Sequence, residues 1–128
     1  MIYGIGCDIV KVSRFEKWVR SEGSYIERFF HEDERLSESV SFQRKCESYA
    51  GKFAAKEAFS KALGTGISGF SLKDVYVVSD SKGKPEFHVA GKALELVEEL
   101  CGKNSRIHVS ISHEKEYAVA YAVIETGN

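Results

Sequence analysis

The spacing of apolar residues changes along the chain, and it predicts which segments are strands and which are helices. Apolar residues alternate with glycine and aspartate over residues 2–10, as in a strand with two different faces. Ser13 is followed by Glu16 three positions later, which is a capping box, so we expect a helix to begin at Ser13. The longest segment with helical spacing runs from about Ser41 to Leu63. Because its apolar residues cover more than one stripe, we expect a central, buried helix there.

The second half of the chain is predicted to consist mostly of strands. The segment Gly64-Thr65-Gly66 should end the central helix, because glycine adopts the left-handed cap conformation at no steric cost. The remaining predicted elements are strands at 72–78 and 86–89, a helix at 92–100, and strands at 106–112 and 117–125. This order predicts an α+β fold in which a mainly antiparallel sheet packs on helices.

Length, charge and cysteine content narrow the class of protein. The 128 residues fit one domain, residues 1–128, without a repeat or a linker. A net charge of −1 gives no overall field for nucleic acid or an anionic membrane, and no apolar run is long enough to span one. The three cysteines are far apart and the N-terminus does not resemble a signal peptide, so we expect a cytoplasmic protein. A deep private cleft is hard to build at this size, which favours a site shared between subunits.

Asp8 and Glu57 are the two carboxylates that stand out from apolar surroundings. Asp8 lies in the first predicted strand, where Gly4 and Gly6 would let a ligand or another backbone approach closely. The alternative for Asp8 is an exposed residue on an edge strand. Glu57 lies in the most apolar part of the central helix, four residues before Lys61. The alternative there is a helical ion pair worth roughly 0.2–0.5 kcal/mol.

These residue types favour a hard cation over zinc. Two carboxylates with a nearby lysine and no histidine cluster suit Mg²⁺, which usually binds one or two carboxylates together with substrate phosphates. Lys61 also lies one turn before Gly64, and the backbone N–H groups of that glycine loop could meet an anion. The hypothesis requires the fold to bring Asp8 and Glu57 together.

Three further residues are candidates for binding phosphate. His113 follows the predicted strand 106–112 at the point where the chain turns, and a solvated turn histidine is the alternative interpretation. Lys52 and Lys56 lie on the central helix together with Lys61. The common nucleotide-binding signatures are absent: the glycines near the N-terminus do not complete a dinucleotide fingerprint, and the chain has neither a Walker loop nor a nucleophile elbow.

Four segments, in order, resemble the holo-acyl-carrier-protein synthase family of phosphopantetheinyl transferases, and together they extend over nearly the whole chain. They are residues 4–10 (GIGCDIV), 50–66 (AGKFAAKEAFSKALGTG), 83–94 (GKPEFHVAGKAL) and 109–122 (VSISHEKEYAVAYA). The second segment is the most specific of the four. The resemblance implies a phosphopantetheinyl transferase-like fold. It also implies transfer of the 4′-phosphopantetheine group of coenzyme A to a serine of acyl carrier protein, with release of adenosine 3′,5′-bisphosphate, in support of fatty acid biosynthesis.

The same resemblance implies roles for individual residues. Asp8 and Glu57 match two magnesium ligands, and Glu57 and Lys61 match catalytic positions. Arg14 matches a basic residue that meets the acidic carrier protein. The positions implied to bind coenzyme A are Lys52, Lys56, Lys61, Gly64 and His113. The resemblance further implies a homotrimer with its sites at subunit interfaces.

The chain departs from the family pattern at two positions. Lys52 stands where many members carry arginine, so a forked contact to phosphate becomes a point charge. Trp18 adds an aromatic ring near the implied carrier surface. The base that would take the proton from the carrier serine stays open among Glu57, Asp8 and a metal-bound water.

Two functions of other classes remain as alternatives. One is a non-catalytic module that binds an acidic helical partner without magnesium, through the basic residues Arg14, Lys17, Arg20 and Arg28. The other is a magnesium-dependent hydrolase of a small pyrophosphate, which would need no carrier protein.

Overall fold

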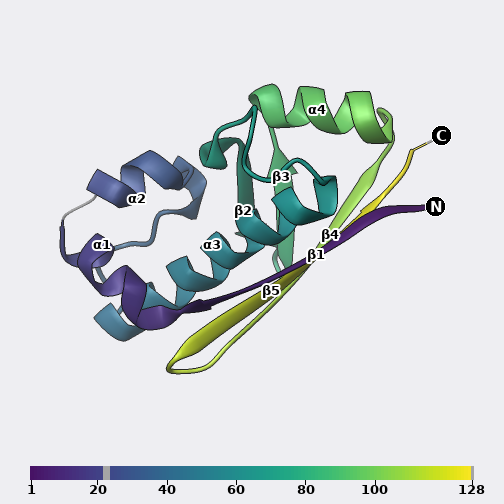
Figure 1. Ribbon diagram of the computed structural model, residues 1–128. Coiled ribbons are helices and arrows are strands. Elements are labelled where there is room, and N and C mark those ends of the chain that lie inside the picture. The colour runs from purple at the N-terminus through teal and green to yellow at the C-terminus, as the bar shows by residue number, and fades with distance from the viewer. Residues whose placement is uncertain (22–23, 128) are drawn as a thin grey trace.

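The structure is a computed structural model that describes residues 1–21 and 24–127. The strands and α-helices in chain order are β1 (Ile2–Lys11), α1 (Glu16–Arg20), α2 (Ser24–Phe29), α3 (Phe42–Leu63), β2 (Val75–Ser79), β3 (Pro85–Val89), α4 (Gly91–Cys101), β4 (Arg106–His113) and β5 (Tyr117–Glu125). Three short 3₁₀ helices are η1 (Val12–Phe15), η2 (Glu32–Glu34) and η3 (Leu72–Asp74). In Figure 1 the two chain ends lie close together, and the backbone N–H of Thr126 donates to the carbonyl of Met1 at 2.8 Å.

The strands form two antiparallel sheets. In the larger sheet β5 lies between β1 and β4, and the smaller sheet is the β2–β3 hairpin. Every strand pair in the described part of the chain is antiparallel. The predicted α+β fold with a mainly antiparallel sheet on helices is therefore confirmed, although the strands divide into two sheets.

Helix α3 is the centre of the molecule, as the sequence predicts. The Ser41 hydroxyl accepts a hydrogen bond from the backbone N–H of Arg44 at its start, and Gly64, with φ +88°, ends it. The helix packs mainly against β1 and β5 and buries residues on several of its sides. Figure 1 shows α3 across one face of the larger sheet, with α1 and α2 at one end of the molecule and α4 at the other.

Two glycines allow β1 to lie directly on α3. A Cβ at Gly4 would be 1.9 Å from the carbonyl oxygen of Ala62, and a Cβ at Gly6 would be 1.8 Å from that of Ala58. Any side chain at either position would therefore collide with helix backbone. Gly6, the later glycine, meets the earlier turn of α3, which shows that the strand runs antiparallel to the helix.

Two predictions about local structure were wrong. The chain does not begin a helix at Ser13 with a capping box. Instead η1 begins at Val12, and the residues before η1 and α1 make no side-chain cap. Burial explains the tight turn, because Val12 and Phe15 both enter the core while Ser13 stays exposed. In the predicted strand 72–78, the first three residues form η3, and the strand itself begins at Val75.

One hydrophobic core connects the helices to both sheets. It is centred on α3 and includes Phe15 from η1, Phe30 after α2, Val75 and Val77 from β2, and the inward side chains of β5. No helix among residues 1–21 and 24–127 has the length and apolar character needed to cross a membrane.

Candidate active site

The first carboxylate of the site comes from β1. Gly4, Gly6 and Asp8 lie on the face of the strand that meets α3, while the residues between them point the other way. The Asp8 side chain is only 19% exposed, and its Oδ1 lies 3.1 Å from Nζ of Lys61. Lys61 also donates to the carbonyl oxygen of Cys7 at 3.0 Å. Asp8 is therefore a partnered residue between strand and helix, and the exposed-aspartate alternative is wrong.

The second carboxylate, Glu57, lies on α3 in the electrostatic field of the same groups. Burial raises the pKa of the Glu57 carboxyl and the negative charge of Asp8 raises it further, while Lys61 and Arg14 offset part of the shift. The ion pairs formed by the described residues do not include Glu57 with Lys61, because Lys61 reaches across to β1 instead. The structure thus brings Asp8, Glu57 and Lys61 to one place.

Arg14 stands beside this group on η1. Its guanidinium lies over the rings of two phenylalanines, 5.6 Å from the centroid of Phe53 and 5.9 Å from that of Phe15. Phe53 lies one helical turn before Glu57 on α3. The contact between Arg14 and the Phe53 ring therefore holds the guanidinium on the same side of the helix as the Glu57 carboxylate. An exposed cation therefore lies near the Glu57 carboxylate.

The donor atoms at this place fit a hard divalent cation with an incomplete protein shell. Asp8 and Glu57 offer carboxylate oxygens, which are the ligands that Mg²⁺ prefers. Within residues 1–21 and 24–127, no three or more His, Cys, Asp or Glu side chains gather where they could hold a metal ion. Two carboxylates suit Mg²⁺, which keeps several waters and takes oxygens from a phosphate substrate, better than a metal that requires a full protein cage.

Lys52 and His113 meet in a separate pocket of about 270 Å³. Its walls come from α3, the β2–β3 hairpin and β4, and its lining residues are Arg44, Glu47, Ser48, Gly51, Lys52, Val77, Ser79, Gly83, Pro85, Ile111 and His113. Nδ1 of His113 lies 3.2 Å from Oε1 of Glu47. The Lys52 ammonium donates to the carbonyl oxygen of Glu34 at 3.1 Å, and burial lowers the pKa of Lys52.

The two groups of candidate residues lie on different sides of α3. Lys52 and Glu57 are five positions apart, which places them roughly 140° apart around a helix with 3.6 residues per turn. The pocket lining includes neither of the two carboxylates nor Lys61. A single chain therefore presents the carboxylate group and the Lys52–His113 pocket as separate surfaces.

Two sequence-predicted positions do not offer free donors. Lys56 is fully buried, and its ammonium donates to Glu34, to the carbonyl of Leu72 and to the carbonyl of Val75. The expectation that Lys56 binds coenzyme A is corrected on this ground, since all three of its N–H bonds are used inside the core. At Gly64 the backbone N–H donates to the carbonyl oxygen of Ser60, so it caps the helix rather than facing an anion.

Sequence reasoning missed Arg44, Glu47 and Ser48, which line the pocket together with Lys52. Their spacing of three and four along α3 puts them on one helix face with Lys52, and this was the available signal. Two larger cavities, of about 520 Å³ each, lie elsewhere. Val19 and Tyr49 are among the residues that line one, Ser39 and Val40 are among those that line the other, and no predicted site residue lines either. Volume alone does not mark the chemistry in this molecule.

Known proteins are similar to this chain in both sequence and fold. The model of the 4′-phosphopantetheinyl transferase superfamily matches residues 4–122. The holo-[acyl-carrier-protein] synthase of Treponema denticola is 45% identical over 125 residues, covering 98% of this chain and 99% of that one. A holo-(acyl-carrier-protein) synthase from Bacillus anthracis, solved in complex with CoA (3′,5′-ADP), is 40% identical with a TM-score of 0.81 and 99% coverage of both chains. The holo-ACP-synthase of Plasmodium yoelii is 30% identical with a TM-score of 0.84, covering 100% and 98%.

The chain belongs to the 4′-phosphopantetheinyl transferase superfamily. Its similarity to the holo-[acyl-carrier-protein] synthases extends over nearly the full length of both partners, which confirms the resemblance carried by the four sequence segments.

Proposed function

We propose that this chain transfers the 4′-phosphopantetheine group of coenzyme A to a serine hydroxyl of an acyl carrier protein. The observation that carries the proposal is the meeting of Asp8, Glu57 and Lys61 between β1 and α3, in a chain of this superfamily. The serine oxygen loses its proton to a base of the site and forms a bond to the β-phosphorus. The bond from that phosphorus to the bridging oxygen breaks, and adenosine 3′,5′-bisphosphate leaves. Catalysis of such a transfer is mainly positioning and charge stabilisation.

Asp8 and Glu57 are the residues that would hold Mg²⁺. The bound ion supplies neutralisation of the charge on the pyrophosphate oxygens during transfer. Burial is the main cause of the raised pKa of Glu57, and the negative charge of Asp8 adds to it. A cation held by the two carboxylates would offset both effects, which supports this assignment.

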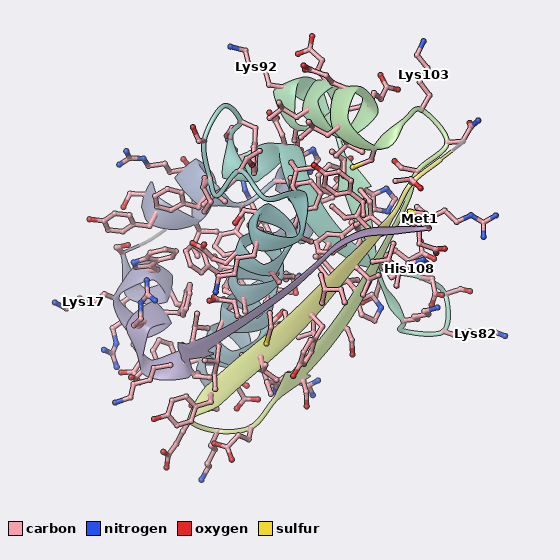
Figure 2. The ribbon with its side chains drawn as sticks, turned by 45° about the vertical axis from the view of Figure 1, so that its right-hand side comes forward. Met1, Lys17, Lys82, Lys92, Lys103 and His108 are labelled. Carbon is pink, nitrogen blue, oxygen red and sulfur yellow. The ribbon has the colours of Figure 1, made fainter. Side chains whose placement is uncertain are left out.

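Lys61 would bind the leaving phosphate. In the structure its ammonium is paired with Asp8, but the Lys61 side chain is 54% exposed. A pair with one exposed partner contributes at most about 1 kcal/mol, so a phosphate can draw the ammonium away at small cost. A second cation, Arg14, lies near Glu57 and would meet the acidic carrier protein together with Lys17, which extends away from the molecule in Figure 2.

Lys52 and His113 of one subunit would bind the nucleotide end of a coenzyme A molecule whose pyrophosphate lies at the carboxylates of a neighbouring subunit. Their pocket and the carboxylate group lie on different sides of α3, so a second copy has to complete the site. The uncovered face of the larger sheet supports assembly: Ile5, Ile9 and Tyr121 are 64%, 62% and 51% exposed on adjacent strands. Contiguous apolar surface of this kind marks an interface. The assembly we propose is a homotrimer.

A mass measurement on apo acyl carrier protein incubated with the chain, coenzyme A and Mg²⁺ tests the function. The carrier should gain the mass of one phosphopantetheine group, with one adenosine 3′,5′-bisphosphate released for each carrier. Binding of an unmodified carrier, weakened by salt and indifferent to Mg²⁺, would favour the binding module. Release of nucleotide without carrier modification would favour the hydrolase. A place in fatty acid biosynthesis and in the cytoplasm belongs to the same proposal.

A further inference from the structure

A fully buried ion pair lies behind the Lys52–His113 pocket. Oε1 of Glu34, in η2, is 2.6 Å from Nζ of Lys56 on α3, and both side chains have no exposed surface. The same ammonium donates to the carbonyls of Leu72 at 3.0 Å and Val75 at 2.6 Å. The pair is thus completely satisfied inside the core.

The Glu34 carboxylate also binds two backbone N–H groups. Oε1 accepts from His31 at 2.9 Å, which closes the turn of η2, and Oε2 accepts from Val77 of β2 at 2.9 Å. One carboxylate therefore fastens η2 to α3 and to the β2–β3 hairpin. Well-packed apolar side chains of the same volume often stabilise a core as well as a buried ion pair does, so stability alone does not account for it.

The contacts of Glu34 lead directly to the pocket wall. Val77 and Lys52 both line the pocket, and both hydrogen-bond to Glu34, although Glu34 itself is not in the lining. The Lys52 ammonium is held by the backbone carbonyl of Glu34, whose position depends on the carboxylate of the same residue. Burial lowers the pKa of Lys52, and the negative charge of Glu34 offsets part of that lowering.

We propose that Glu34, locked by Lys56, is a positioning residue for the donor substrate: it holds Lys52 at the wall of the pocket so that the ammonium meets a phosphate of the nucleotide. This rests on the proposed function, in which Lys52 binds coenzyme A. Glu34 touches no substrate, and it acts through Lys52 alone.

The double variant Glu34→Gln/Lys56→Met tests the proposal without leaving a buried charge unpaired. The dissociation constant for adenosine 3′,5′-bisphosphate, measured by calorimetry, should rise about tenfold, the cost of one lost contact to a charged group. The KM for coenzyme A should rise alongside it, while kcat per folded enzyme stays within about twofold. Lys52→Met should weaken binding to a similar extent, and adding it to the double variant should cause no further loss.

Glu32→Gln is the matched control, because it removes the same charge from the same short helix on an exposed side. It should leave nucleotide affinity unchanged.

Should the double variant not fold, Glu34→Asp provides a second test. It keeps the negative charge beside Lys56 but shortens the side chain that reaches the backbone N–H of Val77, and it should weaken nucleotide binding at unchanged kcat. Unchanged affinity in the folded variants, or losses that add to those of Lys52→Met, would overturn the proposal. Wild-type protein that neither binds the nucleotide nor modifies the carrier would instead refute the proposed function, and this inference with it.

Discussion

At the scale of single residues, Glu57 carries a cost in stability at the place proposed for the metal ion. Its carboxyl is partly removed from water and lies near Asp8, so the folded state disfavours the charged form. The raised folded-state pKa means that this cost is present at neutral pH. It shrinks as the pH falls through the raised value and is gone below the ordinary value of 4.5.

Glu57→Gln should therefore stabilise the metal-free protein at pH 7. Because the carboxyl keeps part of its solvation, the gain should stay below about 1 kcal/mol, or roughly 4 °C in Tm. Thermal unfolding in EDTA at pH 7 and again at pH 4 measures it, and the difference from wild type should shrink at the lower pH. A variant less stable than wild type at pH 7 would mean that Glu57 makes favourable contacts that outweigh its burial and its repulsion from Asp8.

Lys61→Ala should reduce kcat by about 10²-fold, because in the proposed function its charge would act on the leaving phosphate in the transition state. The affinity for Mg²⁺ should change little, since the two carboxylates stay in place. Steady-state kinetics and calorimetric titration of Mg²⁺ separate the two effects. Lys92→Ala, an exposed lysine on α4, is the control and should behave as wild type. Loss of metal binding without loss of kcat would assign Lys61 another role.

The sequence identified Asp8, Glu57 and Lys61 because charged residues in apolar segments are rare and their helical spacing is readable. It did not distinguish Lys56 from Lys52. The partner that draws Lys56 into the core is Glu34, which is 22 positions away, and no local pattern marks a contact over that separation. Lys52 lies one turn earlier on α3. Its ammonium donates to the backbone carbonyl of Glu34, and the residue lines the pocket.

At the scale of elements, the contact between β1 and α3 determines where Asp8 lies. Glycine spacing in the strand and alanines in the helix were visible in the sequence, which is why the central helix and the first strand were predicted correctly. The division into two sheets was not predicted, because β1 pairs with β5 across more than a hundred residues and no local pattern marks such a pairing. The start at Ser13 was wrong for a similar reason: burial of neighbouring apolar side chains outweighed a local capping signal.

Gly6→Ala should separate β1 from α3. A Cβ there would lie 1.8 Å from the carbonyl oxygen of Ala58, and neither backbone can yield without moving the strand. We expect a loss of about 3 kcal/mol in the free energy of unfolding, together with a fall in kcat as Asp8 is displaced. Urea unfolding and the transfer assay measure the two effects.

Gly66→Ala is the comparison for that experiment. Gly66 has φ +62°, and a Cβ added there would meet no atom within 4 Å, so only backbone strain of about 1–2 kcal/mol should appear. Equal stability losses in the two variants would show that the strand–helix contact is not the tight one described.

At the scale of the whole molecule, the arrangement of surfaces is the reason for proposing a site shared between chains. The core is continuous across both sheets, and a single domain over residues 1–128 stays a prediction. Around it, the carboxylate group, the Lys52–His113 pocket and the exposed apolar sheet face occupy different sides. The small size of the chain already favoured a shared site, but the sequence could not specify which face is left uncovered, since that depends on how the sheet packs against α3.

Ile9→Glu should break the proposed homotrimer. Ile9 is 62% exposed in the single chain, so the substitution should change monomer stability by less than about 0.5 kcal/mol while placing a charge in the interface. Light scattering should give about the mass of one 14.3 kDa chain instead of three, and transfer activity should fall with it. Leu94→Glu, an equally apolar exposed position on α4, should leave both unchanged. A wild-type chain that is monomeric and fully active would contradict the proposal that two subunits form each site.

The initial rate of carrier modification as a function of Mg²⁺ concentration, compared between wild type and Glu57→Gln, tests most directly whether two carboxylates from β1 and α3 bind one ion for phosphoryl transfer. We predict a saturable rise with Mg²⁺ for the wild-type chain and a rate at least about 10²-fold lower for the folded variant across the whole range. A Glu57→Gln chain that transfers at a near-wild-type rate with the same Mg²⁺ dependence would contradict the account.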